Sequence, residues 1–327
     1  MNELALASFA AANDAHLVGE PRSARFASFK AGFDAPAELE RLAQLGFRFL
    51  ARSAPGFPPL LRAIHDPPPG LFVRGDEQFA LLARPAVAIV GARACSAYGR
   101  QIARSLGREL AAAGLVVVSG LARGVDSEAH RGALEAAGTT VAVLGCGIDR
   151  DYPAAHRELA RQVATAGLVV SEYAPGVEPA PWRFPARNRI VAGLCTATVV
   201  VEARERSGAL ITADFALEEG REVFAVPGEI TSALSAGSNA LLRLGATPLT
   251  CAQDVLESYG IEVPERHAPE LGANASGVLE RVREGAAGAD ELARATGLGA
   301  GELAAVLTEL ELAGVVAQEE GIYRACS

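Results

Sequence analysis

The sequence predicts an α/β protein whose core is a doubly wound, parallel sheet. Short apolar runs rich in β-branched residues recur along the middle of the chain, which is typical of strands that helices cover on both faces. Stretches with apolar residues at helical spacing separate these runs. Loops of small residues join the runs to the helices that follow them. Strands and helices that alternate in this way form parallel sheets.

The clearest β-α-β repeat lies between residues 86 and 126. The runs at 86–90 and 115–118 predict strands, and the residues between them have the apolar spacing of a helix. Each strand runs directly into a glycine-containing loop, at 91–93 and 119–124. Both loops must therefore lie at the carboxyl edge of the sheet, where open α/β sheets bind their ligands.

The same alternation predicts six core strands and makes the sheet Rossmann-like. These strands are 86–90, 115–118, 140–144, 168–171, 198–201 and 223–226. Two earlier runs, 47–51 and 71–75, predict strands that extend one edge of the sheet. Leucines at helical spacing predict a helix from Pro36 to Leu45 within a short N-terminal helical segment.

A second domain is expected after the sheet. Helices predicted at 277–283, 290–296 and 301–313 precede two short strands, and this order is typical of a winged helix. The third helix contains three glutamates and no basic residue, so we expect it to contact protein rather than duplex DNA. The predicted domains are a helical module at 1–45, the sheet domain at 46–262, a polar linker at 263–275 and the winged helix at 276–327.

The net charge of −9 is distributed unevenly along the chain. Residues 85–262 carry 16 basic and 19 acidic groups, whereas residues 263–327 carry 5 and 11. Most of the negative charge therefore belongs to the C-terminal segment, and a nucleic acid at the sheet is not excluded.

Several classes of protein are excluded by missing motifs. Lys30 is the only lysine, so the core holds neither a Walker A motif nor a lysine Schiff base. The first glycine loop lacks the spacing of a dinucleotide site, and the chain contains no HExxH or GxSxG. The five cysteines have no metal-ligand spacing, so we expect no metal and no cofactor. Without an apolar run of about 18 residues or a secretory signal, we expect a cytoplasmic protein with no membrane contact.

Arginines gather in the loops at the carboxyl edge of the sheet, at positions 93, 123, 183, 187, 189 and 206. A single exposed arginine is more often solvated, or paired with a carboxylate such as Glu172, Glu202 or Glu205, than bound to a ligand. Together with helix N-termini and Phe184, the set suits a ligand with several phosphates and stackable bases. Single-stranded nucleic acid fits this pattern, and a small phosphorylated nucleotide fits it nearly as well.

Two acidic positions have structural interpretations. Asp126 precedes a predicted helix that runs to about Ala137, and we interpret its carboxylate as the N-cap. Asp66 follows His65 in a proline-flanked segment, and we interpret the pair as part of a turn rather than as an acid–base pair. Arg189, one turn into the helix after its loop, is expected to pair with a carboxylate.

A specific combination of motifs covers residues 55–260. The motifs include GAR at 91–93, SGLARGVD at 119–126, LGCGID at 144–149, YP at 152–153, FPARNRI at 184–190, SGALITA at 207–213 and FAVPG at 224–228. In this order they resemble the DNA-processing protein A family, also called Smf. The resemblance implies an extended Rossmann fold, a homodimer and binding of single-stranded DNA. It also implies a protein that loads the RecA recombinase during natural transformation.

The resemblance further implies a DNA pocket. The matching positions are Gly91, Arg93, Ser119, Gly120, Arg123, Gly124, Phe184, Arg187, Asn188, Ser207 and Gly208. Arginines 93, 123, 187 and 206 would neutralise phosphates, and Phe184 would stack on a base. Ala92 replaces a serine often found in this motif, which removes one hydroxyl group from the site.

The leading interpretation is a non-enzymatic recombination mediator without catalytic residues, which protects incoming single-stranded DNA. The alternative is a Rossmann-like nucleotide phosphoribohydrolase with Glu172 or Glu202 as acid or base. That class needs a PGGxGT loop, and only Pro-Gly-Glu occurs here, at 227–229. A transcription regulator is a third possibility, which the acidic third helix of the winged domain disfavours.

Overall fold

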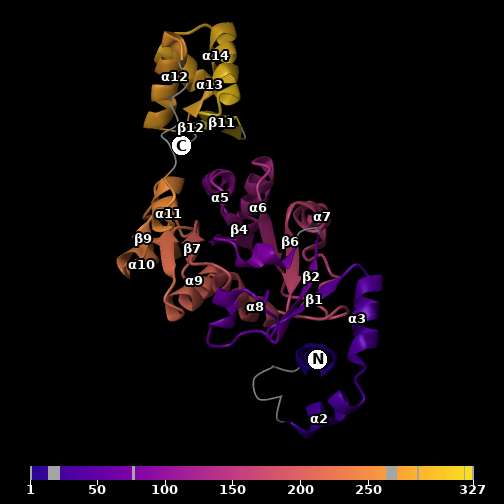
Figure 1. Cartoon of the computed structure of the whole chain (residues 1–327). Coiled ribbons are helices and arrows are strands. Elements are labelled where there is room, and N and C mark those ends of the chain that lie inside the picture. The colour runs from indigo at the N-terminus through magenta and orange to yellow at the C-terminus, as the bar shows by residue number, and fades with distance from the viewer. Residues whose placement is uncertain are drawn as a thin grey trace. The chain divides into compact units, whose positions relative to one another are not determined.

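The computed structural model describes residues 2–13, 23–75, 78–262, 271–285, 287–319 and 321–325. The chain divides into two compact units, Met1–Glu262 and Val263–Ser327, and Figure 1 labels many of their elements. Most of the predicted linker, residues 263–270, lies outside the described residues. No helix in these described ranges is long and apolar enough to cross a membrane.

A nine-stranded sheet forms the centre of the first unit, with the order β1-β2-β6-β5-β4-β3-β7-β8-β9. Its strands are β1 (Arg48–Ala51), β2 (Gly70–Arg74), β3 (Ala86–Val90), β4 (Val116–Ser119), β5 (Thr140–Val143), β6 (Leu168–Ser171), β7 (Ala197–Val200), β8 (Glu222–Ala225) and β9 (Thr247–Pro248). In this spatial order, the seven strands β6-β5-β4-β3-β7-β8-β9 pair in parallel with their neighbours. Strand β2 pairs antiparallel with both β1 and β6. The predicted core strands and edge strands are therefore confirmed. β9 has two residues, too few for a periodic pattern, and was not predicted.

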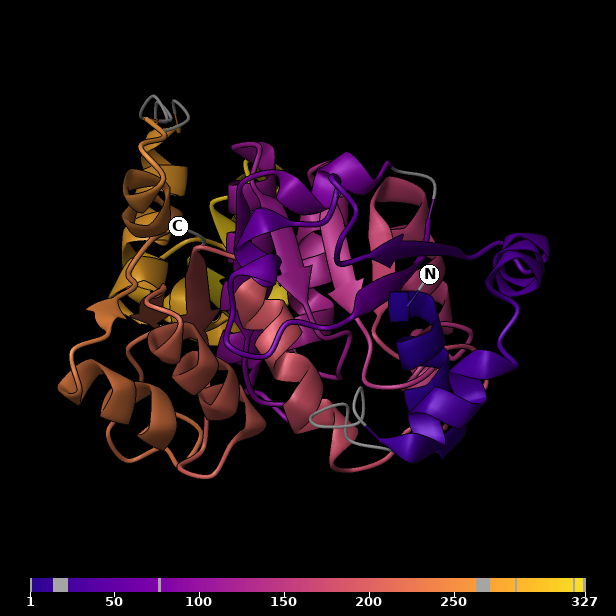
Figure 2. The same ribbon diagram turned by 60° about the horizontal axis from the view of Figure 1, so that its bottom comes forward.

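Helices cover both faces of this sheet (Figures 1 and 2). One face packs against α5 (Ala97–Ala112), α6 (Val125–Glu135), α7 (Arg157–Ala166) and α11 (Ala252–Ser258). The other face packs against α4 (Pro59–Arg62), α8 (Arg183–Gly193), α9 (Gly208–Glu218) and α10 (Ala236–Arg243). Alternate residues of β3 enter the two cores, Ala88 on one side and Ile89 on the other, as the two-residue period of a strand requires. The doubly wound prediction is confirmed.

The N-terminal segment forms α1 (Asn2–Asn13), α2 (Ala24–Ala31) and α3 (Ala35–Gln44). The carboxylate of Asp34 caps α3 by accepting from the backbone N–H of Ala37 at 3.0 Å. Leu4 and Leu42 are buried in the same core as Phe72 of β2. Helices α1 and α3 therefore share a core with the edge of the sheet, and Phe26 of α2 packs with Ala5 and Phe9 of α1.

The second unit has its own hydrophobic core, built around Val278, Leu292 and Leu310. It contains α12 (Ala273–Glu284), β10 (Ala287–Gly288), α13 (Ala289–Thr296), α14 (Ala300–Leu312), β11 (Val316–Glu319) and β12 (Ile322–Ala325). Its antiparallel strands have the order β10-β12-β11. The winged-helix prediction is confirmed, although α12 begins at Ala273, inside the predicted linker. The third strand, β10, was not predicted because it has only two residues.

Candidate nucleic-acid interface

The loops after β3, β4 and β7 meet the first turn of α8 at the carboxyl edge of the parallel strands and enclose a cavity of about 220 Å³. Its lining consists of Val90, Gly91, Arg93, Gly120, Ala122, Asp126, Phe184, Pro185, Arg187, Asn188, Val191, Ser207, Gly208, Ala209 and Thr212. A second cavity of about 350 Å³ shares five of these residues. It is lined by Arg93, Gly120, Ala122, Arg123, Tyr152, Pro153, Phe184 and Arg187. We call them the inner and the outer cavity.

Nine of the eleven residues expected around DNA line these cavities, Arg123 in the outer one and the others in the inner one. Ser119 and Gly124 line neither. The buried hydroxyl of Ser119 donates to the backbone oxygen of Ile89 at 2.6 Å. Gly124 has a φ of +76°, and a Cβ there would lie 2.3 Å from the oxygen of Ala92. Ser119 therefore joins the end of β4 to β3, and Gly124 allows its loop to pack closely against the loop after β3. Neither residue lines a cavity.

An arginine and an aromatic ring form the wall common to both cavities. The exposed guanidinium of Arg93 lies 5.3 Å from the ring centroid of Phe184, which is cation–π distance. The ring of Tyr152 lies on the outer-cavity side, with its centroid 5.2 Å from that of Phe184 and an interplanar angle of 30°. An exposed cation beside two aromatic rings provides the two kinds of contact that a nucleotide needs.

Arg187 contributes charge from a buried position. It is 4% exposed, and its Nη1 donates to the backbone oxygen of Gly120 at 2.8 Å and to that of Val143. Its Nε donates to the side-chain oxygen of Asn188 at 3.2 Å. Burial lowers the pKa of Arg187, although nearby Asp126 acts in the opposite direction. Its guanidinium therefore joins α8 to the sheet and makes the cavity wall positive.

Asp126 is not the N-cap of α6, contrary to the sequence prediction. The helix begins at Val125 after Gly124, and the carboxylate of Asp126 accepts from the backbone N–H groups of Gly120 at 3.2 Å and Ala122 at 3.3 Å. It thus stabilises the loop before the helix. Burial raises the pKa of Asp126, whereas the guanidinium groups of Arg187 and Arg93 lower it.

The N-terminus of α9 supplies a further attraction for anions. Ser207 caps the helix by accepting from the backbone N–H of Ala209 at 3.3 Å, and the side-chain amide of Asn188 donates to the backbone oxygen of Gly208 at 3.0 Å. These residues line the inner cavity, so the positive end of the α9 dipole lies at its wall.

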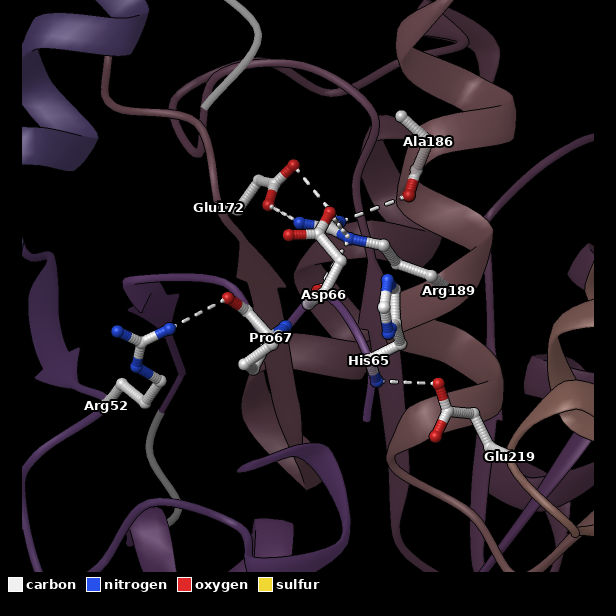
Figure 3. Close-up of polar contacts among 8 residues, drawn as sticks. All are labelled: Arg52, His65, Asp66, Pro67, Glu172, Ala186, Arg189 and Glu219. Atoms are coloured by element: carbon white, nitrogen blue, oxygen red, sulfur yellow. Dashed lines mark hydrogen bonds and ion pairs between the residues drawn. The ribbon is translucent and has the colours of Figure 1, made fainter. Parts of the chain in front are cut away.

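Two other arginines of the predicted set are engaged inside the protein. Arg189 forms a bidentate pair with Glu172, at 3.2 and 2.6 Å, and its Nε donates to the carboxylate of Asp66 at 3.0 Å (Figure 3). Its expected pairing with a carboxylate is confirmed. Arg183 is buried and lies over the rings of Trp182 and Tyr173, 4.8 and 5.3 Å from their centroids.

Both carboxylates of the enzyme alternative have structural partners. Glu172 pairs with Arg189, and Glu202 accepts from the backbone N–H of Ser96 at 2.8 Å and from its hydroxyl at 2.5 Å. Neither glutamate lines the inner or the outer cavity. In the described part of the chain, no group of three His, Cys, Asp or Glu side chains is arranged to hold a metal ion.

Sequence reasoning left Tyr152 and Asp126 out of the site. Tyr152 follows the glycine-rich loop after β5, and an aromatic residue there was a usable signal because that loop also ends at the carboxyl edge. The role of Asp126 depends on the folded path of the loop before it, which no local pattern shows.

Two family models match the chain. DNA recombination-mediator protein A matches residues 48–260, and the DprA winged helix domain matches residues 262–321. The DNA processing protein DprA of Streptococcus pneumoniae is 47% identical over 203 residues, which are 61% of this chain and 70% of that protein. Protein Smf of Escherichia coli is 39% identical over 293 residues, covering 83% of this chain and 76% of its own length.

Two solved structures have the same fold. The X-ray structure of DNA processing protein A from S. pneumoniae superposes with a TM-score of 0.65 at 39% identity and covers 81% of this chain and 94% of that one. A structure of the Helicobacter pylori protein, described for its single-stranded DNA binding mode, superposes with a TM-score of 0.59 at 32% identity. That match covers 65% of this chain and 95% of the other.

Proposed function

This chain belongs to the DNA recombination-mediator protein A family, and from that premise we propose that it binds single-stranded DNA at the inner and outer cavities. Its role is that of a cytoplasmic recombination mediator, which protects incoming DNA and loads the RecA recombinase in natural transformation. It acts as a homodimer. The single-stranded DNA binding mode described for the H. pylori relative supports the proposed binding of single-stranded DNA.

The observation that carries the proposal is the Arg93–Phe184 pair at the wall shared by the two cavities. A phosphate placed at Arg93 gains a cation whose side chain is exposed, and a base beside it gains the ring of Phe184. The N-terminus of α9 adds a second attraction for phosphate in the inner cavity. None of these contacts depends on base identity, which suits a protein that binds incoming DNA of any sequence.

We also propose that the protein acts without catalysis. An acid or base must reach the reacting atoms, and Glu172 and Glu202 are held by Arg189 and Ser96 away from both cavities. Incubation with nucleoside monophosphates should release no free base. Release at a rate proportional to protein concentration, and lost in Glu202→Gln, would support the phosphoribohydrolase instead.

A salt titration of binding tests the DNA site. Fluorescence anisotropy with labelled oligothymidine should give a slope of log affinity against log salt of about −1.4, since Arg93 and Arg123 are exposed, line the cavities, and each phosphate contributes about 0.7. Arg93→Ala should lower the affinity and make the slope shallower by about 0.7. Phe184→Ala should lower the affinity by about 1 to 3 kcal/mol with an unchanged slope.

The matched control is Arg161→Ala, which removes an exposed arginine of α7 that pairs with Glu158 and lines neither cavity. It should bind like the wild type. If Arg93→Ala retained both affinity and slope, the cavities would not be the DNA site. For the mediator role, RecA-dependent strand exchange on DNA coated with single-strand binding protein should speed up when this protein is added.

A further inference from the structure

The outer cavity extends beyond the residues that the DNA pocket was expected to contain. Tyr152 and Pro153, from the loop after β5, form part of its wall. Tyr152 is 42% exposed, although it contacts the ring of Phe184. An aromatic ring exposed on a cavity wall is a ready surface for a second ring, because stacking removes its apolar face from water.

The two cavities diverge from a shared wall. Both contain Arg93 and Phe184, and the inner cavity continues toward Ser207 at the N-terminus of α9. The outer cavity continues toward Tyr152 and Arg123. A strand whose backbone crosses Arg93 would therefore place neighbouring nucleotides in different cavities. The volume of the outer cavity, about 350 Å³, is within the range of small-molecule sites.

Two ion pairs hold the chain immediately before Tyr152. Asp151 pairs with Arg74 of β2 at 2.6 Å, and Arg150 pairs with Glu178 at 2.7 Å. The thiol of Cys146 also donates to the backbone oxygen of Arg150 at 3.6 Å. The backbone that carries the ring is thus ordered before any ligand arrives, which reduces the entropy lost on binding.

We propose that Tyr152 and Arg123 form a second nucleotide subsite in the outer cavity, in which Tyr152 stacks on a nucleobase and Arg123 contacts the adjoining phosphate. This inference rests on the proposed binding of single-stranded DNA. Phe184 and Arg93 serve the neighbouring nucleotide. The subsite accepts any base, because every base has a face for stacking.

Variants of the full chain test the subsite by anisotropy with oligothymidine. Tyr152→Ala should bind at least fivefold more weakly with an unchanged salt slope, the pattern expected when one base–aromatic stack is lost. Tyr152→Phe should bind within twofold of the wild type, because the ring remains. Arg123→Ala should make the slope shallower by about 0.7. The control is Tyr98→Ala, which removes a tyrosine of similar exposure, 39%, that lines neither cavity.

Photocrosslinking of the unmodified protein provides a test that does not depend on any variant folding. Oligothymidine containing iododeoxyuridine should crosslink to aromatic residues, and trypsin releases Tyr152 in the peptide 151–157 and Phe184 in the peptide 184–187. We expect label on both peptides. Label on 184–187 alone, with wild-type binding by Tyr152→Ala, would overturn the second subsite while leaving DNA binding intact. Wild-type binding by Phe184→Ala as well as Tyr152→Ala would overturn the proposed function itself.

Discussion

A buried histidine illustrates chemistry at the scale of one residue. The Nδ1 of His130, on α6, lies 2.7 Å from the hydroxyl of Thr140, and that hydroxyl donates to the backbone oxygen of Val117 at 2.7 Å. Because the hydroxyl proton of Thr140 is donated to Val117, Nδ1 of His130 must carry a proton and donate it to the hydroxyl oxygen of Thr140. Nε2 has no hydrogen-bond partner among the described residues. Burial lowers the pKa of His130 to about 3, so the ring stays neutral inside the folded protein.

This histidine makes stability depend on pH. In the unfolded chain a histidine titrates near pH 6.5, so between about pH 6.5 and pH 3 the unfolded state binds the extra proton. The free energy of unfolding should therefore fall as the pH falls through this window, by up to about 1.4 kcal/mol per pH unit. Urea unfolding of wild type and His130→Gln at pH 7.5, 6 and 5 should show a smaller decline for the variant. Val163→Ala, a buried change without a titrating group, should leave the decline as in the wild type, and equal declines for wild type and His130→Gln would contradict the assignment.

At the scale of one element, helix α8 brings the DNA residues to the cavities. Phe184 lies in its first turn, and Arg187 joins it to the loop after β4 and to the last residue of β5. Arg189 fixes the same helix to Glu172, after β6, and to Asp66 (Figure 3). The side chains of Arg189 and Glu172 are both buried, so neither charge has water as a substitute partner.

Removing one partner of this pair should destabilise the fold. Glu172→Ala leaves the guanidinium of Arg189 buried without its bidentate partner, and we expect the free energy of unfolding to fall by about 3 kcal/mol. Urea unfolding measures this change. Glu158→Ala is the control, because its pair with Arg161 is exposed and its loss should leave the free energy of unfolding unchanged within error. Equal effects of the two substitutions would show that burial does not decide the strength of these pairs.

At the scale of the whole molecule, every residue of the inner and outer cavities belongs to Met1–Glu262. The second unit has a separate core, and helix α14 carries glutamates and no basic residue. Basic side chains supply most of the attraction for phosphates, so this helix is poorly suited to the DNA backbone.

Truncation after Glu262 should therefore leave the affinity for single-stranded oligothymidine within a few-fold of the full chain. The retained unit keeps its own core and both cavities. Anisotropy on the two proteins at one salt concentration makes the comparison. A loss of more than tenfold, about 1.4 kcal/mol, would place part of the DNA site in the second unit.

The proposed homodimer has two copies of the cavities. Oligonucleotides long enough to reach both should bind more tightly than short ones, because the second contact is made at a high effective concentration. Light scattering at micromolar concentration should give about twice the chain mass of 33.8 kDa. A mass of 33.8 kDa under those conditions would show that the protein is a monomer.

The sequence by itself determined the order of the core strands along the chain and the apolar spacing of the helices between them. It also determined the edge of the sheet where the site lies. These features follow from short-range patterns, since β-branched runs and apolar spacing depend on neighbouring residues. The sequence already favoured a carboxylate partner for Arg189, but only the tertiary structure identified that partner and separated the buried arginines from the exposed ones. Arg93 stays exposed over Phe184, whereas Arg189 is engaged by Asp66, 123 positions away.

The same reason explains the other residues that the sequence assigned wrongly or left out. Asp126 stabilises a loop because that loop folds back over its carboxylate. Tyr152 did have a local signal, its place after the glycine-rich loop of β5, but its contact with Phe184 depends on the pairing of distant segments. Local patterns specify which elements form. The partner of each charged side chain depends on which distant segments the packed sheet brings within hydrogen-bonding distance, and only the folded chain decides that.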